Sequence, residues 1–114
     1  MNTPSDRSVR LLRNAFTMTV NLGKSEEYAR RHNPIWPELA ILLKDHGVHN
    51  YSIFYLQSTR QLFGYAEIED EAQWASIAQD GVCKRWWEHM SEIMPSHPDH
   101  SPLTANLTEM FHLD

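Results

Sequence analysis

Two prolines inside an otherwise helical segment constrain the fold most strongly. Pro34 and Pro37 lie within residues 25–46, where the apolar residues follow helical spacing. The residue before a proline resists the α conformation, and proline itself lacks the N–H that a helix interior needs. We therefore expect two helices, with Asn33 as the N-cap of the second and Pro34 as its first residue. Pro37 would then lie in the opening turn.

This break gives one histidine an unusual position. His32 would lie just outside the N-terminus of the second helix, and Tyr28, four residues earlier, shares its helical face. Histidine exchanges protons near neutral pH. We interpret His32 as a proton-transfer residue; the alternative is a helix-end histidine that makes one backbone hydrogen bond. Arg31 and the positive helix end would both lower the pKa of His32.

The remaining periodicity predicts the other elements. Alternating apolar residues indicate strands over about residues 16–22, 48–56, 61–69 and 107–113. Ser25 is the expected N-cap of the first helix, and Gly47 follows the end of the second. A further helical region after the N-cap Asp70 is interrupted at Asp80-Gly81 and continues to about residue 94. Residues 1–12 form an expected N-terminal tail, and residues 13–114 form a single domain.

The resulting order is β-α-β-β-α-β with a split second helix, which is the ferredoxin-like pattern of the α+β class. Such a sheet has helices on one face only. His49, Tyr51, Ile53 and Tyr55 alternate along the second strand, and we assign them to one side. We place the last three on the helix-free face. Because water would not favour that apolar face, a second copy is its simplest cover, and we expect a homodimer.

Charge and cysteine content exclude several classes. The chain has 114 residues and a net charge of -5, which argues against nucleic-acid binding. No apolar run approaches the roughly 20 residues that span a membrane. Cys83 is the single cysteine, so there is no internal disulfide and a reducing compartment is favoured. These observations predict a cytoplasmic protein with no nucleic-acid or membrane partner.

Three aromatic residues have two interpretations each. Trp86 and Trp87 are adjacent on a helix, so their side chains point about 100° apart. One can pack in the core while the other lines a cavity, where an aromatic face suits the C–H faces of a sugar. Spacing alone favours core roles for both. Tyr51 is a packed strand residue unless it faces the same cavity as His32.

A metal site is not expected. Two histidine pairs have ligand-like spacing, His46 with His49 and His97 with His100, but no cysteine or acidic pair completes a zinc site. Cys83 lies on an apolar stripe, which indicates a buried structural thiol. The sequence contains no nucleophile elbow, phosphate-binding loop or dinucleotide fingerprint.

Several segments together resemble the L-rhamnose mutarotase family, and the likeness extends from about residue 13 to the end of the chain. They are Glu26-Glu27-Tyr28, Arg30-Arg31-His32-Asn33-Pro34-Ile35-Trp36-Pro37-Glu38-Leu39, His49-Asn50-Tyr51, Val82-Cys83 with Arg85-Trp86-Trp87, Met94-Pro95, Pro98-Asp99 with Ser101-Pro102, and Phe111.

The resemblance implies a cofactor-free, cytoplasmic, dimeric isomerase of the dimeric α+β barrel type. It would interconvert the α and β anomers of L-rhamnose by acid–base ring opening and closure. The family's proton donor corresponds to His32, and its substrate contacts correspond to Tyr28, Tyr51, Trp86 and Trp87. The partner base stays open between a water molecule and a sugar-bound tyrosine.

Two other functions remain compatible with the sequence. One is a cofactor-independent monooxygenase or haem-degrading enzyme, since both use a paired ferredoxin-like architecture. The other is a non-catalytic module that binds a sugar without accelerating anomer exchange.

Overall fold

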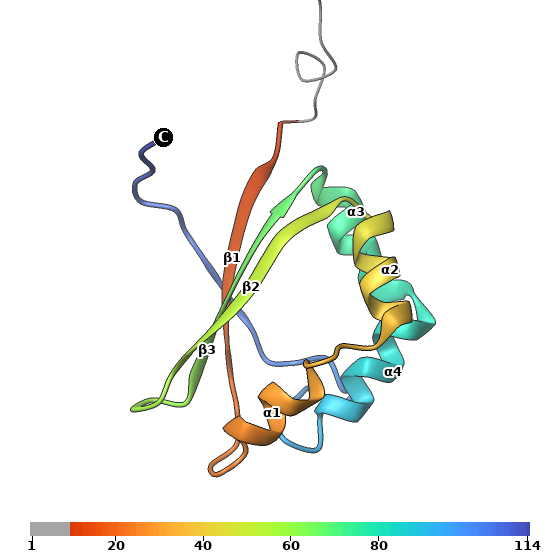
Figure 1. The fold of residues 1–114 in the computed structure, drawn as a ribbon, viewed down its shortest axis with the longest axis vertical. Coiled ribbons are helices and arrows are strands. Elements are labelled where there is room, and N and C mark those ends of the chain that lie inside the picture. Colours follow the sequence, from red (N-terminus) through yellow and green to blue (C-terminus); the bar gives the residue numbers. More distant parts are fainter. Residues whose placement is uncertain (1–9) are drawn as a thin grey trace, which may run out of the picture.

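A four-stranded antiparallel sheet carries all the helices on one face (Figure 1). The computed structural model describes residues 10–114, so most of the expected tail lies outside the described residues. The elements are β1 (Leu12–Thr19), α1 (Ser25–Arg31), α2 (Pro37–Asp45), β2 (Val48–Leu56), β3 (Gln61–Ile68), α3 (Glu71–Ser76), a 3-10 turn (Ile77–Gln79), α4 (Gly81–Met90) and β4 (Ala105–Leu107). The strand order β2-β3-β1-β4 confirms the ferredoxin-like topology.

Two aspartates begin the helices of the split region. The Asp70 carboxylate accepts a hydrogen bond from the Gln73 N–H at 3.0 Å, which confirms the predicted cap of α3. Asp80 accepts from the Val82 N–H at 2.8 Å and so begins α4 where the sequence predicted an interruption. Helix α4 ends at Met90, before the predicted position, because the chain turns after Ser91.

The break between α1 and α2 is confirmed, but its details were predicted wrongly. His32 is the C-cap of α1, and α2 begins at Pro37 with Trp36 as its N-cap. Asn33 does not open α2; its side-chain amide donates instead to the Ala29 carbonyl at 2.7 Å. That carbonyl belongs to the last turn of α1 and also accepts a hydrogen bond from the His32 N–H at 3.1 Å. Asn33 therefore closes the first helix, and His32 lies at a helix C-terminus.

A bulge in β2 decides which face each of its side chains joins. His49 pairs with Glu67, whereas Ser52 pairs with Tyr65, so one extra residue enters β2 between them. Asn50 in this bulge has a φ of 48°. The bulge reverses the alternation, and the expectation that His49 and Tyr51 share a side is therefore wrong.

The second consequence of the bulge concerns the face without helices. Ile53 pairs with Gly64 and Tyr55 with Leu62, and these β3 residues are buried beneath the helices. Tyr51, Ile53 and Tyr55 consequently face the helices, and their assignment to the helix-free face was wrong.

The helix-free face is nevertheless apolar, with other residues. Phe54 on the edge strand β2 pairs with Phe63 on β3, and Phe54 is 59% exposed. Leu56, on β2 beside Phe54, and Leu107, on the opposite edge strand β4, are each 44% exposed. We call these four side chains the open-face cluster. An exposed patch of this kind on a sheet is typical of an interaction surface.

The two ends of the chain depart from prediction. Strand β1 starts at Leu12, within the expected tail, and Leu22 is 80% exposed because the strand stops at Thr19. Ser25 is the first residue of α1 rather than its N-cap; Lys24 precedes the helix without a side-chain cap. The last strand is β4, which pairs with β1 and ends at Leu107, where the predicted strand would have begun.

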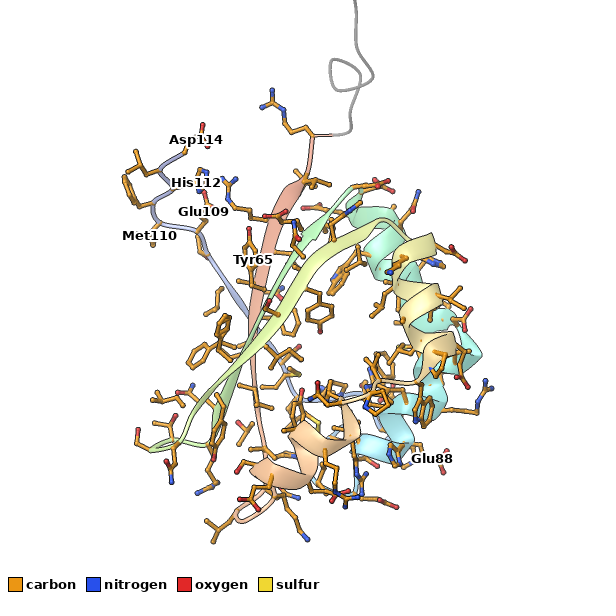
Figure 2. All side chains as sticks on the ribbon, in the orientation of Figure 1. Tyr65, Glu88, Glu109, Met110, His112 and Asp114 are labelled. Carbon is orange, nitrogen blue, oxygen red and sulfur yellow. The ribbon has the colours of Figure 1, made fainter. Side chains whose placement is uncertain are left out.

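Residues 108–114 continue beyond β4 on the side of the sheet away from the helices (Figure 1). Figure 2 shows Glu109, Met110, His112 and Asp114 along this segment, with Tyr65 of β3 nearby. Arg13 binds Glu109 with an Nε–Oε1 distance of 2.6 Å and joins the segment to β1. Met110 is 89% exposed.

A glycine in β3 accommodates an aromatic ring on the neighbouring strand. Gly64 pairs with Phe16, and a Cβ added at Gly64 would lie 2.5 Å from Phe16 Cζ. The Phe16 ring therefore lies directly against the glycine backbone, on the face covered by the helices. No helix among residues 10–114 is both long and apolar enough to cross a membrane.

Candidate active site

A cavity of about 960 Å³ lies between the sheet and the helices. Side chains from both layers point into the space between them (Figure 2). The cavity is lined by all five residues singled out from the sequence: Tyr28, His32, Tyr51, Trp86 and Trp87. They come from α1, its C-terminal end, β2 and α4. A cavity of this size has room for a monosaccharide and several waters.

His32 is held by the end of α1. Its Nδ1 lies 2.7 Å from the Tyr28 carbonyl oxygen, four residues earlier. A carbonyl only accepts hydrogen bonds, so Nδ1 carries the hydrogen. The other ring nitrogen, Nε2, is then an acceptor in the neutral ring and a donor in imidazolium. Nε2 is the nitrogen left to exchange a proton with a ligand in the cavity.

Aromatic rings enclose the imidazole on two sides. The Tyr28 ring stacks on it with a centroid separation of 4.4 Å and an interplanar angle of 29°. The Trp86 ring meets it edge-on at 5.1 Å. Trp36 contacts Trp86 edge-on at 5.0 Å and continues the aromatic wall toward α2. Because adjacent rings fix one another, the imidazole has a defined orientation.

Burial among these rings lowers the pKa of His32 below its ordinary value of 6.5. The hydrogen bond to the Tyr28 carbonyl opposes this shift without cancelling it. A lowered pKa was predicted, but from the wrong cause. His32 is the C-cap of α1 and does not adjoin the start of α2 in sequence, and the Arg31 guanidinium is paired with the carboxylates of Glu27 and Glu92.

Both tyrosine hydroxyls remain protonated at neutral pH. Burial raises the pKa of Tyr28, and the nearby Tyr51 phenol raises it further. Burial likewise raises the pKa of Tyr51. Tyr51 keeps 36% of its surface accessible, although protein atoms surround its phenol. Each phenol can therefore donate a hydrogen bond to a ligand.

A second aromatic group contributes a different wall of the cavity. Phe16 lies edge-on to Tyr51 at 6.2 Å, and Trp74 of α3 contacts Tyr51 at 6.1 Å. The sequence singled out neither Phe16 nor Trp74 as a site residue. The spacing of each residue within its element is that of an inward-facing side chain, but spacing cannot indicate that the interior is hollow at this point.

The two tryptophans of α4 differ in environment. Trp86 is buried and packs against His32 and Trp36, whereas Trp87 is partly buried and also lines the cavity. Cys83, one turn earlier, is buried, and burial raises the pKa of its thiol to about 11. This thiol is un-ionised at neutral pH, as the expected structural role requires. Within residues 10–114, no group of three or more His, Cys, Asp or Glu is arranged to hold a metal ion.

The fold and this cavity define a small α+β protein of the dimeric α+β barrel type, with a histidine set in an aromatic cavity. The L-rhamnose mutarotase family model matches residues 13–113. The chain therefore belongs to the L-rhamnose mutarotase family.

Individual relatives agree with this assignment. The L-rhamnose mutarotases of Opitutus terrae and Pectobacterium atrosepticum are 64% and 56% identical to this chain over 104 residues. In both comparisons the alignment covers 91% of this chain and 100% of the relative. The crystal structure of L-rhamnose mutarotase from Formosa agariphila is 39% identical, with a TM-score of 0.83 over 90% of this chain and 99% of that one.

More distant structures share the fold alone. A Bordetella bronchiseptica protein assigned to antibiotic biosynthesis monooxygenases has a TM-score of 0.65 at 9% identity. This match covers 89% of the present chain and 98% of the other. Likeness at this identity does not transfer a reaction, so the monooxygenase alternative has support from architecture only.

Proposed function

We propose that this chain interconverts the α and β anomers of L-rhamnose, with His32 as the general acid at the ring oxygen. The single observation that carries this role is that His32 lines the cavity with its Nδ1 bound to the Tyr28 carbonyl. It commits one nitrogen to the backbone and leaves Nε2 for the substrate. The family membership and the names of the relatives support the choice of sugar.

The reaction needs only proton transfers. Imidazolium donates its Nε2 proton to the ring oxygen while a base removes the proton of the anomeric hydroxyl. The bond between C1 and the ring oxygen breaks, and an open-chain aldehyde forms. Rotation about C1–C2 presents the other carbonyl face. On ring closure the attacking hydroxyl returns its proton to Nε2, and the protonated base returns its proton to the carbonyl oxygen, which becomes the new anomeric hydroxyl. A positioned acid–base group contributes about 10²–10⁴-fold to such a step.

The tyrosines and tryptophans have binding roles in this scheme. Tyr28 and Tyr51 donate hydrogen bonds to sugar hydroxyls, and Trp86 and Trp87 contact the C–H faces of the ring. Because burial raises the pKa of both phenols, a tyrosinate base is disfavoured near neutral pH. This favours a water molecule as the partner base.

Saturation-transfer NMR between the two anomeric proton signals of L-rhamnose tests the proposal. The expected result is exchange that increases in proportion to protein concentration above the buffer rate. Ligand-observed binding with exchange at the buffer rate would instead identify a sugar-binding module. No binding, together with a Soret shift on adding haem, would favour the haem-degrading alternative.

A cytoplasmic homodimer is the second part of the proposal. The open-face cluster is an apolar surface with members on both edge strands and on β3, and Met110, Phe111 and Leu113 expose further apolar area on the adjacent C-terminal segment. Two sheets packed face to face would cover both. The single buried thiol, Cys83, is consistent with a reducing compartment.

Light scattering tests the dimer, and the chain offers a matched pair of variants. Phe54 on the open face is 59% exposed, and Ile41 on α2 is 60% exposed. Phe54→Asp should give monomers at micromolar concentration, since a carboxylate would be buried in the interface. Ile41→Asp should remain a dimer. A monomeric wild type, or a dimeric Phe54→Asp variant, would contradict the proposed interface.

A further inference from the structure

Arg31 connects the two helices that supply the proposed acid and its aromatic neighbour. It occupies the last position of α1, immediately before His32. Its side chain is 14% exposed and reaches residues far away in the sequence. Nη1 donates to the His89 carbonyl at 2.6 Å, and Nη2 donates to a Glu92 carboxylate oxygen at 3.0 Å. Nε donates to Glu27 within α1 at 2.7 Å.

The His89 carbonyl is one of the last carbonyls of α4. Such groups lack helical partners, and a cation at a helix C-terminus is favourable. Arg31 therefore fixes the final turn of α4 against the final turn of α1. Trp86 lies in the same turn of α4, three residues before His89.

The ring of His89 extends this arrangement to the aromatic wall. It stacks on Trp36 at 5.4 Å and contacts Trp86 at 5.8 Å. The edge-on contact between His32 and Trp86 thus joins two helices whose ends are held together by one guanidinium. A change at Arg31 frees both ends and alters the separation of these two rings.

Arg30 differs from Arg31 in the feature that matters. Both bind the Glu27 carboxylate. Arg30, however, is 76% exposed, and none of the hydrogen bonds among the described residues joins it to α4. Comparing variants of Arg30 and Arg31 therefore distinguishes the effect of a positive charge beside Glu27 from the effect of a contact that joins α1 to α4.

We propose that Arg31 is a positioning residue, which orients His32 relative to Trp86 by bridging the ends of α1 and α4. This inference rests on the proposed mutarotase function for its kinetic part. Arg31 touches neither a reacting atom nor the cavity in the described structure. The planar fork that reaches Glu27, His89 and Glu92 together is specific to arginine, so lysine at this position retains the charge but loses the bridge.

The experiment compares Arg31→Lys, Glu92→Gln and Arg30→Ala with the wild type. Exchange rates at several sugar concentrations give kcat and KM, and NMR signals of the His32 ring report its orientation within the ring current of Trp86. Arg31→Lys should lower kcat by about 10- to 100-fold, since misplacement of a reacting group by about 1 Å has an effect of this size. KM should change much less, and the His32 signals should shift.

The other variants complete the test. Glu92→Gln, which keeps the contacts to Glu27 and His89, should give a smaller loss in kcat, and Arg30→Ala should match the wild type in both readouts. Unchanged kcat or unchanged His32 signals in folded Arg31→Lys would overturn the inference, as would an equal loss in Arg30→Ala. If the wild type shows no exchange while Arg31→Lys still shifts the His32 signals, the proposed function fails and the positioning role stands.

Discussion

The ends of α1 and α2 are alike in local structure and differ in what surrounds them. Each helix ends at a histidine C-cap, His32 or His46. In each, Nδ1 approaches the carbonyl oxygen four residues earlier, at 2.7 Å for His32 and 2.9 Å for His46. Only His32 lines the cavity and contacts aromatic rings. The carbonyl at the helix end thus sets the tautomer of each histidine, whereas tertiary packing decides which histidine can contact a ligand.

The largest effect should come from exchanging each histidine. His32→Ala should lower anomer exchange by about 10²-fold or more, the usual contribution of an acid–base group. His46→Ala removes an equivalent backbone contact outside the cavity and should leave exchange unchanged. Saturation-transfer NMR measures both, and thermal unfolding verifies that both fold. Near-normal exchange in His32→Ala would transfer the donor role to Tyr28 or Tyr51.

Removing the aromatic neighbour should have the next largest effect. Trp86→Phe weakens the edge contact to His32, and aromatic pairs contribute about 0.5–1.5 kcal/mol, which corresponds to a loss in rate of up to about tenfold. Trp87→Phe, which leaves that contact intact, should affect sugar binding more than kcat. Rates at saturating and at low L-rhamnose distinguish the two. Equal kcat values for Trp86→Phe and the wild type would contradict the role of Trp86 in orienting the acid.

The pH dependence of exchange should reveal the titration of His32. Because imidazolium is the acid, the rate should rise as pH falls and level off below the pKa of His32, which burial lowers from 6.5. His32→Gln should flatten this profile, whereas His46→Gln should leave it in place. A rate that rises with pH through the same transition would instead identify His32 as a base.

The smallest effect should appear in stability. The pKa of His32 is lower in the folded chain than in the unfolded one, so the unfolded state binds more protons between the two values. The contribution of neutral His32 to the free energy of unfolding is complete above pH 6.5 and is lost as pH falls through the folded pKa. Its size is about 1.4 kcal/mol for each unit by which folding lowers the pKa. Unfolding of wild type and His32→Gln between pH 7 and 5 should show a weaker acid dependence in the variant.

The sequence predicted the strand topology correctly, and the five residues that it singled out line one cavity, but it predicted their surroundings poorly. Alternation and caps are local signals, so the strand order and the capping by Asp70 could be anticipated. The bulge at Asn50 carries no comparable signal, and it reversed the face assigned to Tyr51. The contacts of Arg31 span 58 and 61 residues along the chain and depend on how α1 meets α4. No local sequence pattern predicts how these two helices pack against each other.

The position of Asn33 illustrates a different limit. Asparagine before proline is a reasonable N-cap, but the same amide can close the preceding helix, as it does here. Both options satisfy a backbone group at a helix end. Because Asn33 closes α1, His32 lies at the end of the first helix and not at the start of the second. The cause of its lowered pKa is therefore burial and not a helix N-terminus.

The contact between Gly64 and Phe16 makes the shape of the cavity depend on a residue that does not line it. Gly64 is buried in the sheet, and any side chain there would displace the Phe16 ring, which lines the cavity. Alanine at this position would tilt the ring toward the ligand and reduce the space available to it. Relatives that differ at this strand position would therefore be expected to accept sugars of different bulk, even with identical residues touching the substrate.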